Sequence, residues 1–506
     1  MPPASVRAAE PEPGNVTWTK SEVEALLKRR VEQNATRGIA VALIAPDGKV
    51  EIVTAGDSGN PARPQVDGDT LYEIGSITKV FTATMLAQKV EEGSLRLESR
   101  VRDVLPARRW RSPGVGDVTL KQLTTHTSGL PRVPTEWKFM SGLFLSFRNP
   151  YVNYSADDLW AYVSDLEHTP RDDYEVEYSN LGAGLLGQVL AEQEGVSYEA
   201  LVQRRILGPL GMGASGIRTE PARKTFLAVG HSASLVPQSY WDIPSMPGAG
   251  ALRSSTNDMA RFIAAQMQGT LPGAKATQAE YARLNERMTV GLGWFIRRAQ
   301  EDEIFWHNGG TGGFRTFAGF SSKSGQGVVV LSNASVEVDD LGLHLLNRKF
   351  KPNADPRSVH WPSILIGAAL AFGLLTRAWF AADPAPPVPA TPEENARRKS
   401  GRRSLRDRFQ DWRQRTRIGS RIGLIWAVLD LLAIAAFLYL LAPWEWVGVA
   451  VRNGFFALAG VLVLRLIWRL RALPWRDPQP ATNRLSRLFA HVVTLALLGG
   501  IGWNLW

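Results

Sequence analysis

The sequence predicts an α+β domain over residues 20–350, followed by an all-α membrane domain over residues 351–506 and preceded by a flexible segment over residues 1–19. Strand patterns at both ends of the first domain, with helix patterns between them, predict an antiparallel sheet flanked by helices and a helical region. Both ends of the domain are expected to join this sheet. Four apolar runs, each about as long as a bilayer-spanning helix, predict the second domain.

A change of charge separates the two parts. The formal net charge is +10, yet residues 1–350 have 37 basic and 39 acidic residues, whereas the chain from Lys351 onward has 21 basic and 9 acidic ones. The first domain has no basic excess, so we expect no nucleic-acid partner. The chain has no cysteine, which excludes disulfides, thiolate catalysis and cysteine metal sites.

The first domain opens with an amphipathic helix pattern over residues 19–34, behind a Ser/Thr cap. Two strand patterns follow over residues 39–56, around Asp47-Gly48, a pair that favours a hairpin turn. Late in the domain come four more strand patterns, over residues 291–298, 303–309, 314–322 and 325–333.

A serine and a lysine three positions apart stand at the start of a helical run over residues 76–95. Residues three apart share a helix face, so the amine of Lys79 can reach the hydroxyl of Ser76. A lysine can activate a serine when burial or positive charge lowers its pKa, and a helix start offers a backbone N–H to a developing oxyanion. An N-capping serine beside a solvated lysine is the alternative interpretation of the pair alone.

Two later motifs carry groups that would complete such a site. The segment Tyr178–Asn180 directly precedes an amphipathic helix pattern. A tyrosine beside a lysine can share its proton, and an asparagine amide can orient the lysine and bind substrate amides. The segment His307–Gly310 lies on a predicted strand, where a backbone N–H and a donor side chain could face the reacting carbonyl.

The motifs Ser76-x-x-Lys79, Tyr178-x-Asn180 and His307-x-Gly309 occur in the order and rough spacing of the penicillin-recognising serine hydrolases. The chain resembles the branch that includes class C β-lactamases, D-alanyl-D-alanine carboxypeptidases, D-aminopeptidases and related esterases. The segments "LTTHTSGLP" (123–131), "GAGALRSSTNDMARF" (248–262) and "GLGW" (291–294) fit the same family. The resemblance covers roughly residues 20–335 and implies a β-lactamase/transpeptidase-like fold.

The resemblance also implies roles for individual residues. Ser76 would be the acylated nucleophile, and Lys79 and Tyr178 the general base and proton shuttle. The oxyanion hole would use the backbone N–H groups of Ser76 and Gly310. No metal and no other cofactor is implied.

Asn180, His307 and Gly309 would bind substrate, and Asn180 would also orient the lysine. The third motif departs from the family pattern twice, with histidine where many members have lysine and with Asn308 in place of the usual hydroxyl residue. A neutral histidine attracts a carboxylate less than an ammonium does. Peptidase or esterase activity is therefore favoured over efficient β-lactam hydrolysis.

Some features compete with this assignment. Tyr151, in "YVN", also fits Tyr-x-Asn but lacks the Gly-rich helix start that follows Tyr178. His126 suggests a Ser-His pair, whereas the resemblance makes it a packed structural histidine. The chain has no Gly-x-Ser-x-Gly elbow and no His-Glu-x-x-His motif, so neither an α/β-hydrolase nor a zincin is supported.

Four apolar runs make up the predicted membrane domain, over residues 361–381, 422–442, 446–468 and 487–506. Tryptophans gather near their ends, as in an interfacial belt, although buried helices of a soluble domain are an alternative. Three ionisable residues, Arg377, Asp430 and Arg452, lie within the runs. A pair between Arg377 and Asp430 is feasible, with a transport or sensing role as the alternative.

The loop over residues 382–421 is rich in arginine and is expected to be cytoplasmic by the positive-inside rule. This orientation puts the first domain on the outer, periplasmic side of what we expect to be a bacterial inner membrane. The sequence starts without an apolar segment that could direct export. We expect a missing signal segment, with an upstream start or the opposite orientation as alternatives.

Together these features predict a membrane-anchored serine hydrolase. It would form an acyl-enzyme with D-amino-acid-containing peptides of cell-wall type or with small esters and amides. The expected partners are this small-molecule or peptide substrate and the lipid bilayer. The alternatives are a penicillin-binding sensor that is acylated without turnover and signals through the membrane domain, a β-lactamase, and an idle domain that binds wall fragments.

Overall fold

The computed structural model describes residues 18–145, 149–233, 235–299, 302–354 and 356, together with three isolated positions further along the chain. The chain divides into two compact units, residues 1–357 and 358–506. All the named helices and strands belong to the first unit.

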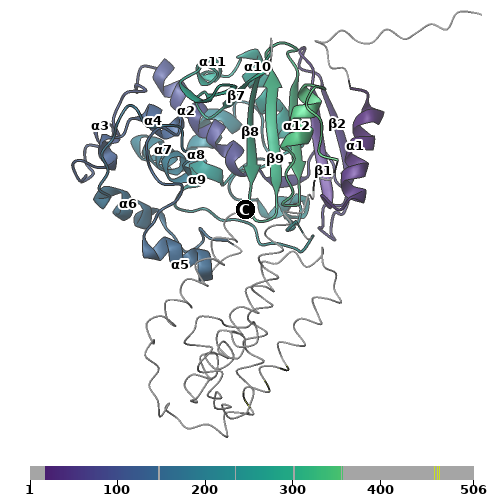
Figure 1. The fold of residues 1–506 in the computed structure, drawn as a ribbon, viewed down its shortest axis with the longest axis horizontal. Coiled ribbons are helices and arrows are strands. Elements are labelled where there is room, and N and C mark those ends of the chain that lie inside the picture. Colours follow the sequence, from purple (N-terminus) through teal and green to yellow (C-terminus); the bar gives the residue numbers. More distant parts are fainter. Residues whose placement is uncertain are drawn as a thin grey trace, which may run out of the picture. The chain divides into compact units, whose positions relative to one another are not determined.

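An eight-stranded antiparallel sheet organises this unit, in the order β2-β1-β10-β9-β8-β7-β6-β5, and a second small sheet pairs β3 with β4 (Figure 1). The strands are β1 (Gly38–Ile44), β2 (Val50–Gly56), β3 (Leu71–Glu73), β4 (Arg253–Ser255), β5 (Ala282–Asn285), β6 (Met288–Val290), β7 (Phe295–Ala299), β8 (Asp302–Gly310), β9 (Arg315–Ser321) and β10 (Gly327–Ser332). Ile39 of β1 lies opposite Ser332 of β10. The prediction that both ends of the domain join one antiparallel sheet is therefore confirmed.

The six predicted strands are present, but their first and last residues differ from those expected. β1 and β2 form the expected hairpin, and Gly48 in its turn has φ +83°, a conformation that glycine adopts at little cost. The strand expected from residue 291 begins only at Phe295, because Gly291 N–H donates to Trp294 O (2.8 Å) in a tight turn where Gly293 has φ +75°. The sequence patterns did not reveal β5 and β6, which are short and partly exposed.

Helices cover the sheet and build a region beside it. They are α1 (Lys20–Glu32), α2 (Thr78–Glu91), α3 (Val101–Val104), α4 (Leu120–Thr124), α5 (Trp137–Leu145), α6 (Ala156–Asp165), α7 (Asn180–Gln193), α8 (Tyr198–Val202), α9 (Pro247–Gly250), α10 (Thr256–Gln268), α11 (Ala274–Thr277) and α12 (Asp339–Leu346). Four further turns are η1 (Gly75–Ile77), η2 (Val115–Asp117), η3 (Gln203–Leu207) and η4 (Pro221–Phe226).

The two faces of the sheet have separate apolar cores. On one face α1 and α12 contribute Val23, Leu27 and Leu341, which pack with strand residues such as Val41. The predicted first helix is confirmed here, because Thr19 forms a capping box with Glu22 at the start of α1. On the other face α10 packs on β1 and β10, and a larger core continues from there into α2 and α7.

The segment from β3 through η1 to α2 lies where this second core meets β8. The close approach of this segment to β8 requires one glycine in the segment, Gly75, and one in β8, Gly309. A Cβ built on Gly309 would lie 2.0 Å from the carbonyl oxygen of Ile74, and a Cβ on Gly75 would lie 2.6 Å from the nitrogen of Gly310. The absence of side chains at these positions brings the end of β8 against the backbone that carries Ser76.

The predicted membrane runs, the arginine-rich loop over residues 382–421, Arg377, Asp430 and Arg452 all lie outside the described residues, apart from three isolated positions. Most of the predicted flexible segment 1–19 is outside them as well. In the part of the chain that the structure describes, no helix is long and apolar enough to cross a bilayer.

Candidate active site

Ser76 lies in the turn η1, between β3 and the first residue of α2. The expected helix start is thus displaced, since the α-helix begins at Thr78. The turn is fixed by the Thr78 hydroxyl, which donates to Gly75 O (2.7 Å) and accepts from Leu252 N–H (3.2 Å). Gly75 and Ile77 are buried, whereas Ser76 between them is partly exposed. The fold therefore holds one hydroxyl at the surface of a rigid, buried turn.

Lys79 projects from the first turn of α2 and is 3% exposed. Its Nζ lies 3.0 Å from Ser76 Oγ, 2.8 Å from Asn180 Oδ1 and 2.7 Å from the carbonyl oxygen of Ala249. The last two atoms can only accept hydrogen bonds, so they would take both N–H groups of a neutral amine. The nitrogen lone pair is then left facing the Ser76 hydroxyl, as a general base requires.

The electrostatics of the site favour that neutral amine. Burial lowers the pKa of Lys79 well below its ordinary value, and the positive charge of Arg132 lowers it further. No carboxylate is among the groups that shift it. This environment favours the neutral amine over the ammonium, as a general base requires.

Tyr178 enters from the segment before α7, and its ring centroid is 4.7 Å from Lys79 Nζ. Burial raises the pKa of Tyr178, whereas interaction with the Ser76 hydroxyl and the charge of Arg132 act in the opposite direction. The phenol therefore keeps its proton at neutral pH. Ser179 caps α7, its Oγ accepting from Gly182 N–H (2.9 Å), which places Asn180 at the helix start. The structure thus brings Ser76, Lys79, Tyr178 and Asn180 together.

The competing motif at Tyr151 also reaches the site, in a different position. The Asn180 side-chain amide donates to Tyr151 Oη (3.4 Å), and the Tyr151 ring lies 5.5 Å from that of Trp241. Because Tyr178 and not Tyr151 contacts both Lys79 and Ser76, Tyr178 has the geometry of a proton shuttle. Tyr151 lines the site on the far side of Asn180.

Gly310 offers its backbone N–H next to the nucleophile. Thr311 N–H donates to Phe314 O (3.1 Å), which makes these two residues a hydrogen-bonded pair in the turn between β8 and β9. Hydrogen-bonded and non-hydrogen-bonded pairs alternate along antiparallel strands. Gly309 and Thr316 therefore form the next hydrogen-bonded pair, and Gly310 lies in the non-hydrogen-bonded position between the two pairs. The N–H of Gly310 consequently points away from β9. On that side β7 pairs with β8 only as far as Trp306. This N–H and that of Ser76 are suitable donors for an oxyanion.

His307 and Asn308 point to opposite faces of β8. His307 is 1% exposed, and its Nδ1 lies at hydrogen-bond distance from the Asn308 carbonyl oxygen, while its Nε2 has no partner among the described residues. Burial lowers the pKa of His307 to about 3. The ring is therefore neutral. The Asn308 side chain donates to Asp339 of α12 (2.6 Å), on the face away from Ser76.

His126 packs against the catalytic tyrosine candidate, with its ring centroid 4.6 Å from that of Tyr178. Its Nδ1 accepts the N–H of Ser179 (3.2 Å), so this nitrogen is not free to act as a base. Burial lowers its pKa well below the ordinary value. These contacts are those of a packed, structural histidine.

Sequence reasoning missed three contributors to the site. The carbonyl of Ala249 is invisible in a sequence because every residue has one, although segment 248–262 fits the family. The Tyr-x-Asn pattern at Tyr151 indicates only a rival catalytic tyrosine. Arg132 follows the segment 123–131 directly, and only its position over Tyr178, with Cζ 5.1 Å from the ring centroid, reveals it.

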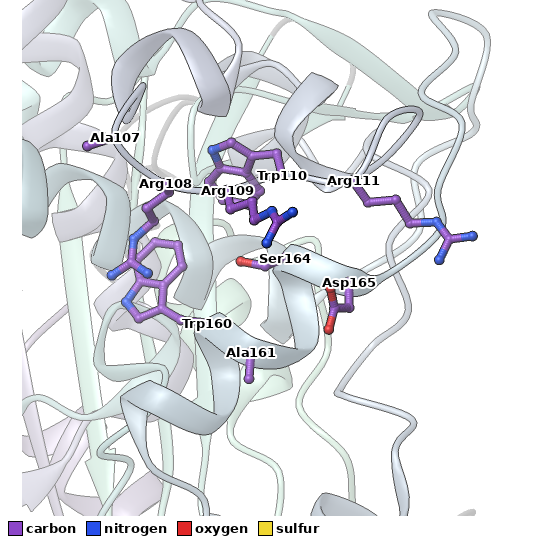
Figure 2. Close-up of a pocket in the computed structure, with 9 residues that line it drawn as sticks. All are labelled: Ala107, Arg108, Arg109, Trp110, Arg111, Trp160, Ala161, Ser164 and Asp165. Atoms are coloured by element: carbon purple, nitrogen blue, oxygen red, sulfur yellow. The ribbon is translucent and has the colours of Figure 1, made fainter.

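A separate cleft of about 670 Å³ lies elsewhere on the domain and contains no comparable chemistry. Arg108 in this cleft stacks on Trp160 (3.7 Å) and forms a two-bond ion pair with Glu192. Figure 2 shows its Ser164 beside Asp165, with no lysine or histidine among the lining residues. Nor do the described residues contain a group of three or more His, Asp or Glu side chains that could hold a metal ion.

Comparison with known proteins identifies a family and a shared fold. The family model described as Beta-lactamase matches residues 23–349. A β-lactamase of Providencia stuartii is 30% identical over 252 residues, which are 49% of this chain and 60% of that protein, less than two thirds of its length. Two solved structures share the fold: a class C β-lactamase (TM-score 0.56, 23% identity, 65% of this chain and 94% of that chain) and a β-lactamase/D-alanine carboxypeptidase of Pseudomonas syringae (TM-score 0.53, 22% identity, 62% and 93%).

Proposed function

We infer the function from two facts: this chain belongs to the Beta-lactamase family, and Lys79 Nζ lies 3.0 Å from Ser76 Oγ with its other contacts satisfied. We propose a serine hydrolase that forms an acyl-enzyme at Ser76. Its substrates would be D-amino-acid-containing peptides of cell-wall type or small esters and amides. The lysine–serine contact carries this proposal, because without an activated hydroxyl the fold alone specifies no chemistry.

The opposite pKa shifts of the two proton-carrying groups suggest their roles in acylation. Lys79, whose pKa is lowered, would accept the Ser76 proton as Oγ attacks the substrate carbonyl. The negative charge on the carbonyl oxygen would be held by the N–H groups of Ser76 and Gly310. Tyr178, whose pKa is raised, would give its proton to the leaving amine or alcohol as the bond to the carbonyl carbon breaks. Proton transfer from Lys79 would restore the phenol.

Deacylation would run the same steps in reverse with water. Tyr178 and Lys79 would take a proton from the attacking water, the bond between the carbonyl carbon and Oγ would break, and Ser76 would regain its proton. Asn180 would hold Lys79 in place and present its amide to the substrate. His307 and Gly309 remain predicted substrate-binding residues. Gly309 also permits the approach of β8 to Ile74.

A β-lactamase is the second candidate, and it is favoured by the printed name of the Providencia stuartii relative. The neutral His307 argues for the peptidase or esterase assignment, because it provides no cation for the carboxylate of a β-lactam. A fluorescent penicillin separates these possibilities. Transient labelling with loss of the β-lactam ring would indicate a β-lactamase, whereas permanent labelling without turnover of any substrate would indicate a sensor.

A substrate panel of p-nitrophenyl esters, D-Ala-D-Ala peptides and D-aminoacyl amides tests the main proposal. We expect Ser76→Ala to abolish both hydrolysis and covalent labelling. Ser164→Ala, which changes a serine of the separate cleft, serves as the matched control and should keep full activity. Hydrolysis that persists in Ser76→Ala would refute the assignment of the nucleophile.

Membrane anchoring and a periplasmic position of the first domain are part of the same proposal. Their support is the four apolar runs and the arginine-rich loop in the sequence. In fractionated cells we expect the full chain to stay with membranes after a carbonate wash, and protease added to the periplasmic side should cleave the first domain. Recovery of the chain in the soluble fraction would contradict the anchor.

A further inference from the structure

Arg132 is held at the edge of the site by its backbone. Its carbonyl oxygen accepts the N–H groups of Asn180 (2.9 Å) and Leu181 (3.1 Å), the first residues of α7. The preceding carbonyl, of Pro131, accepts the Ser179 hydroxyl (2.7 Å). The same helix start that positions Asn180 therefore fixes the point from which the Arg132 side chain extends.

The Arg132 guanidinium is exposed and lies over the catalytic tyrosine candidate. Its Cζ is 5.1 Å from the centroid of the Tyr178 ring, and Lys79 Nζ is 4.7 Å from the same centroid. Both side chains thus lie near one ring, and that ring also interacts with Ser76. Arg132 is close enough to this ring to contact a substrate bound at the nucleophile.

No carboxylate among the described residues pairs with Arg132. Other arginines of the same region differ in this respect: Arg102 pairs with Asp117, Arg108 with Glu192 and Arg111 with Glu167. Within the described residues, the guanidinium of Arg132 contacts the Tyr178 ring and forms no ion pair, which leaves its N–H donors available for a planar, two-oxygen acceptor.

Among the described residues, Arg132 places a positive charge beside the groups that surround the nucleophile. Arg132 is among the groups that shift the pKa of Lys79, Tyr151 and Tyr178, and no carboxylate is among them. Lys79 favours its neutral form and His307 is neutral, so the guanidinium of Arg132 is the cation of this set. His307 cannot replace it, because its Nδ1 hydrogen is directed to the Asn308 carbonyl and its Nε2 presents a lone pair.

We propose that Arg132 binds a carboxylate carried by the substrate, so that this hydrolase prefers anionic esters, amides or peptides. The inference rests on the proposed function and assigns it a substrate class. Arg132 supplies a cation beside the Tyr178 ring, whereas the third motif of this chain has the neutral His307. It acts as a specificity-determining residue and takes no part in proton transfer.

Matched substrate pairs test this assignment. In one pair the acyl group carries the charge, as in the p-nitrophenyl monoester of adipic acid against its terminal carboxamide. In the other the leaving group carries it, as in the acetate ester of 3-hydroxybenzoate against that of 3-hydroxybenzamide. Each pair differs by one charge at nearly constant shape.

We expect Arg132→Gln to lower kcat/KM for the carboxylate member of at least one pair about 10- to 100-fold more than for its carboxamide, the size expected for a charge-assisted hydrogen bond. Arg132→Lys should recover part of the preference. Arg108→Gln, which removes a paired arginine of the separate cleft, should leave the ratio unchanged. Equal losses on both members of both pairs, or no loss, would overturn the proposal.

A binding measurement separates this proposal from the proposed function. Calorimetry on Ser76→Ala, with and without Arg132→Gln, measures the affinity for the adipate monoester and for its carboxamide in the absence of acylation. A carboxylate preference that disappears with Arg132→Gln supports the anion site even if the wild-type protein hydrolyses neither compound. Hydrolysis of both compounds without any preference would leave the hydrolase standing and reject the role of Arg132.

Discussion

Buried ionisable groups on the two faces of β8 have pKa values shifted in opposite directions. On the face towards α2, Lys79 and His307 are bases whose pKa burial lowers. On the face towards α12, Asp339 is an acid whose pKa burial raises to about 7, helped by the charge of Glu337. His307 and Asn308, neighbours in sequence, belong to different faces and contact these different sets.

The difference shows that a shifted pKa does not by itself locate a reaction. Burial drives groups on both faces towards neutrality. Only the first face sets a neutralised group against a nucleophile, since Lys79 contacts the partly exposed Ser76. On the second face Asp339 meets the Asn308 amide, and the nearby Asp340 is paired with Arg30. That face stabilises the domain, and the first one is available for chemistry.

The largest expected effect comes from removing the base. Lys79→Met should lower kcat/KM about 10²- to 10⁴-fold, the range typical of a lost general base, without abolishing the fold. Steady-state kinetics on the best ester of the panel would measure it. The matched control is Lys89→Met on the same helix, because Lys89 is equally buried but pairs with Glu194. Lys89→Met should lower stability and leave kcat unchanged. A loss of kcat in Lys89→Met with unchanged kcat in Lys79→Met would contradict the assignment of the base.

A smaller effect concerns the pH dependence of stability on the first face. The pKa of His307 is about 3 when folded and about 6.5 when unfolded, so between these values the unfolded chain binds the extra proton. Wild-type stability should therefore fall as pH falls from about 6.5 towards 3. In His307→Gln this contribution is absent. Urea unfolding should show the variant gaining stability relative to wild type as the solution is acidified, and a constant difference would contradict a neutral, buried His307.

On the second face, the stability should depend on pH in the opposite direction. We expect the smallest change in stability there, because Asp339 is less completely buried than His307. Its pKa is raised from 3.8 to about 7, so the folded chain holds the extra proton between these values and stability is lost as pH rises. Asp339→Asn keeps an acceptor for Asn308 and removes the ionisation. Thermal unfolding should show this variant gaining on wild type as pH rises from about 4 to 8, with unchanged kcat. If the stability difference from wild type changed with pH in the same direction for His307→Gln and Asp339→Asn, the distinction between the two faces would be wrong.

Sequence patterns predicted local features of the fold well. The Asp47-Gly48 turn, the capped helix behind Thr19 and the buried strand β10 each depend on residues close together in the chain, so periodicity and turn chemistry reveal them. The approach of Ser76, Lys79, Tyr178 and Asn180 could be expected from the family resemblance, because the motifs carry recognisable side chains. The membrane domain stays a prediction.

Other features of the site depend on backbone geometry or on charge balance. The Ala249 carbonyl that accepts from Lys79 and the free N–H of Gly310 follow from tertiary packing and strand register. Arg132 does not stand out in the sequence, because its importance lies in the absence of a carboxylate partner among the residues that the structure describes. Likewise the neutral state of His307 follows from burial that no local pattern shows.

The pairing of Ile39 with Ser332 has a consequence for how the domain is made. During synthesis β1 emerges early, yet its neighbour β10 leaves the ribosome only when nearly all of this unit has been translated. The β1–β2 hairpin must wait with one edge unpaired, and an unpaired edge is a template for misassociation between chains. Closing so long a loop makes folding slow compared with domains built from local contacts. Truncation before β10 would consequently leave an aggregation-prone fragment in place of a smaller enzyme.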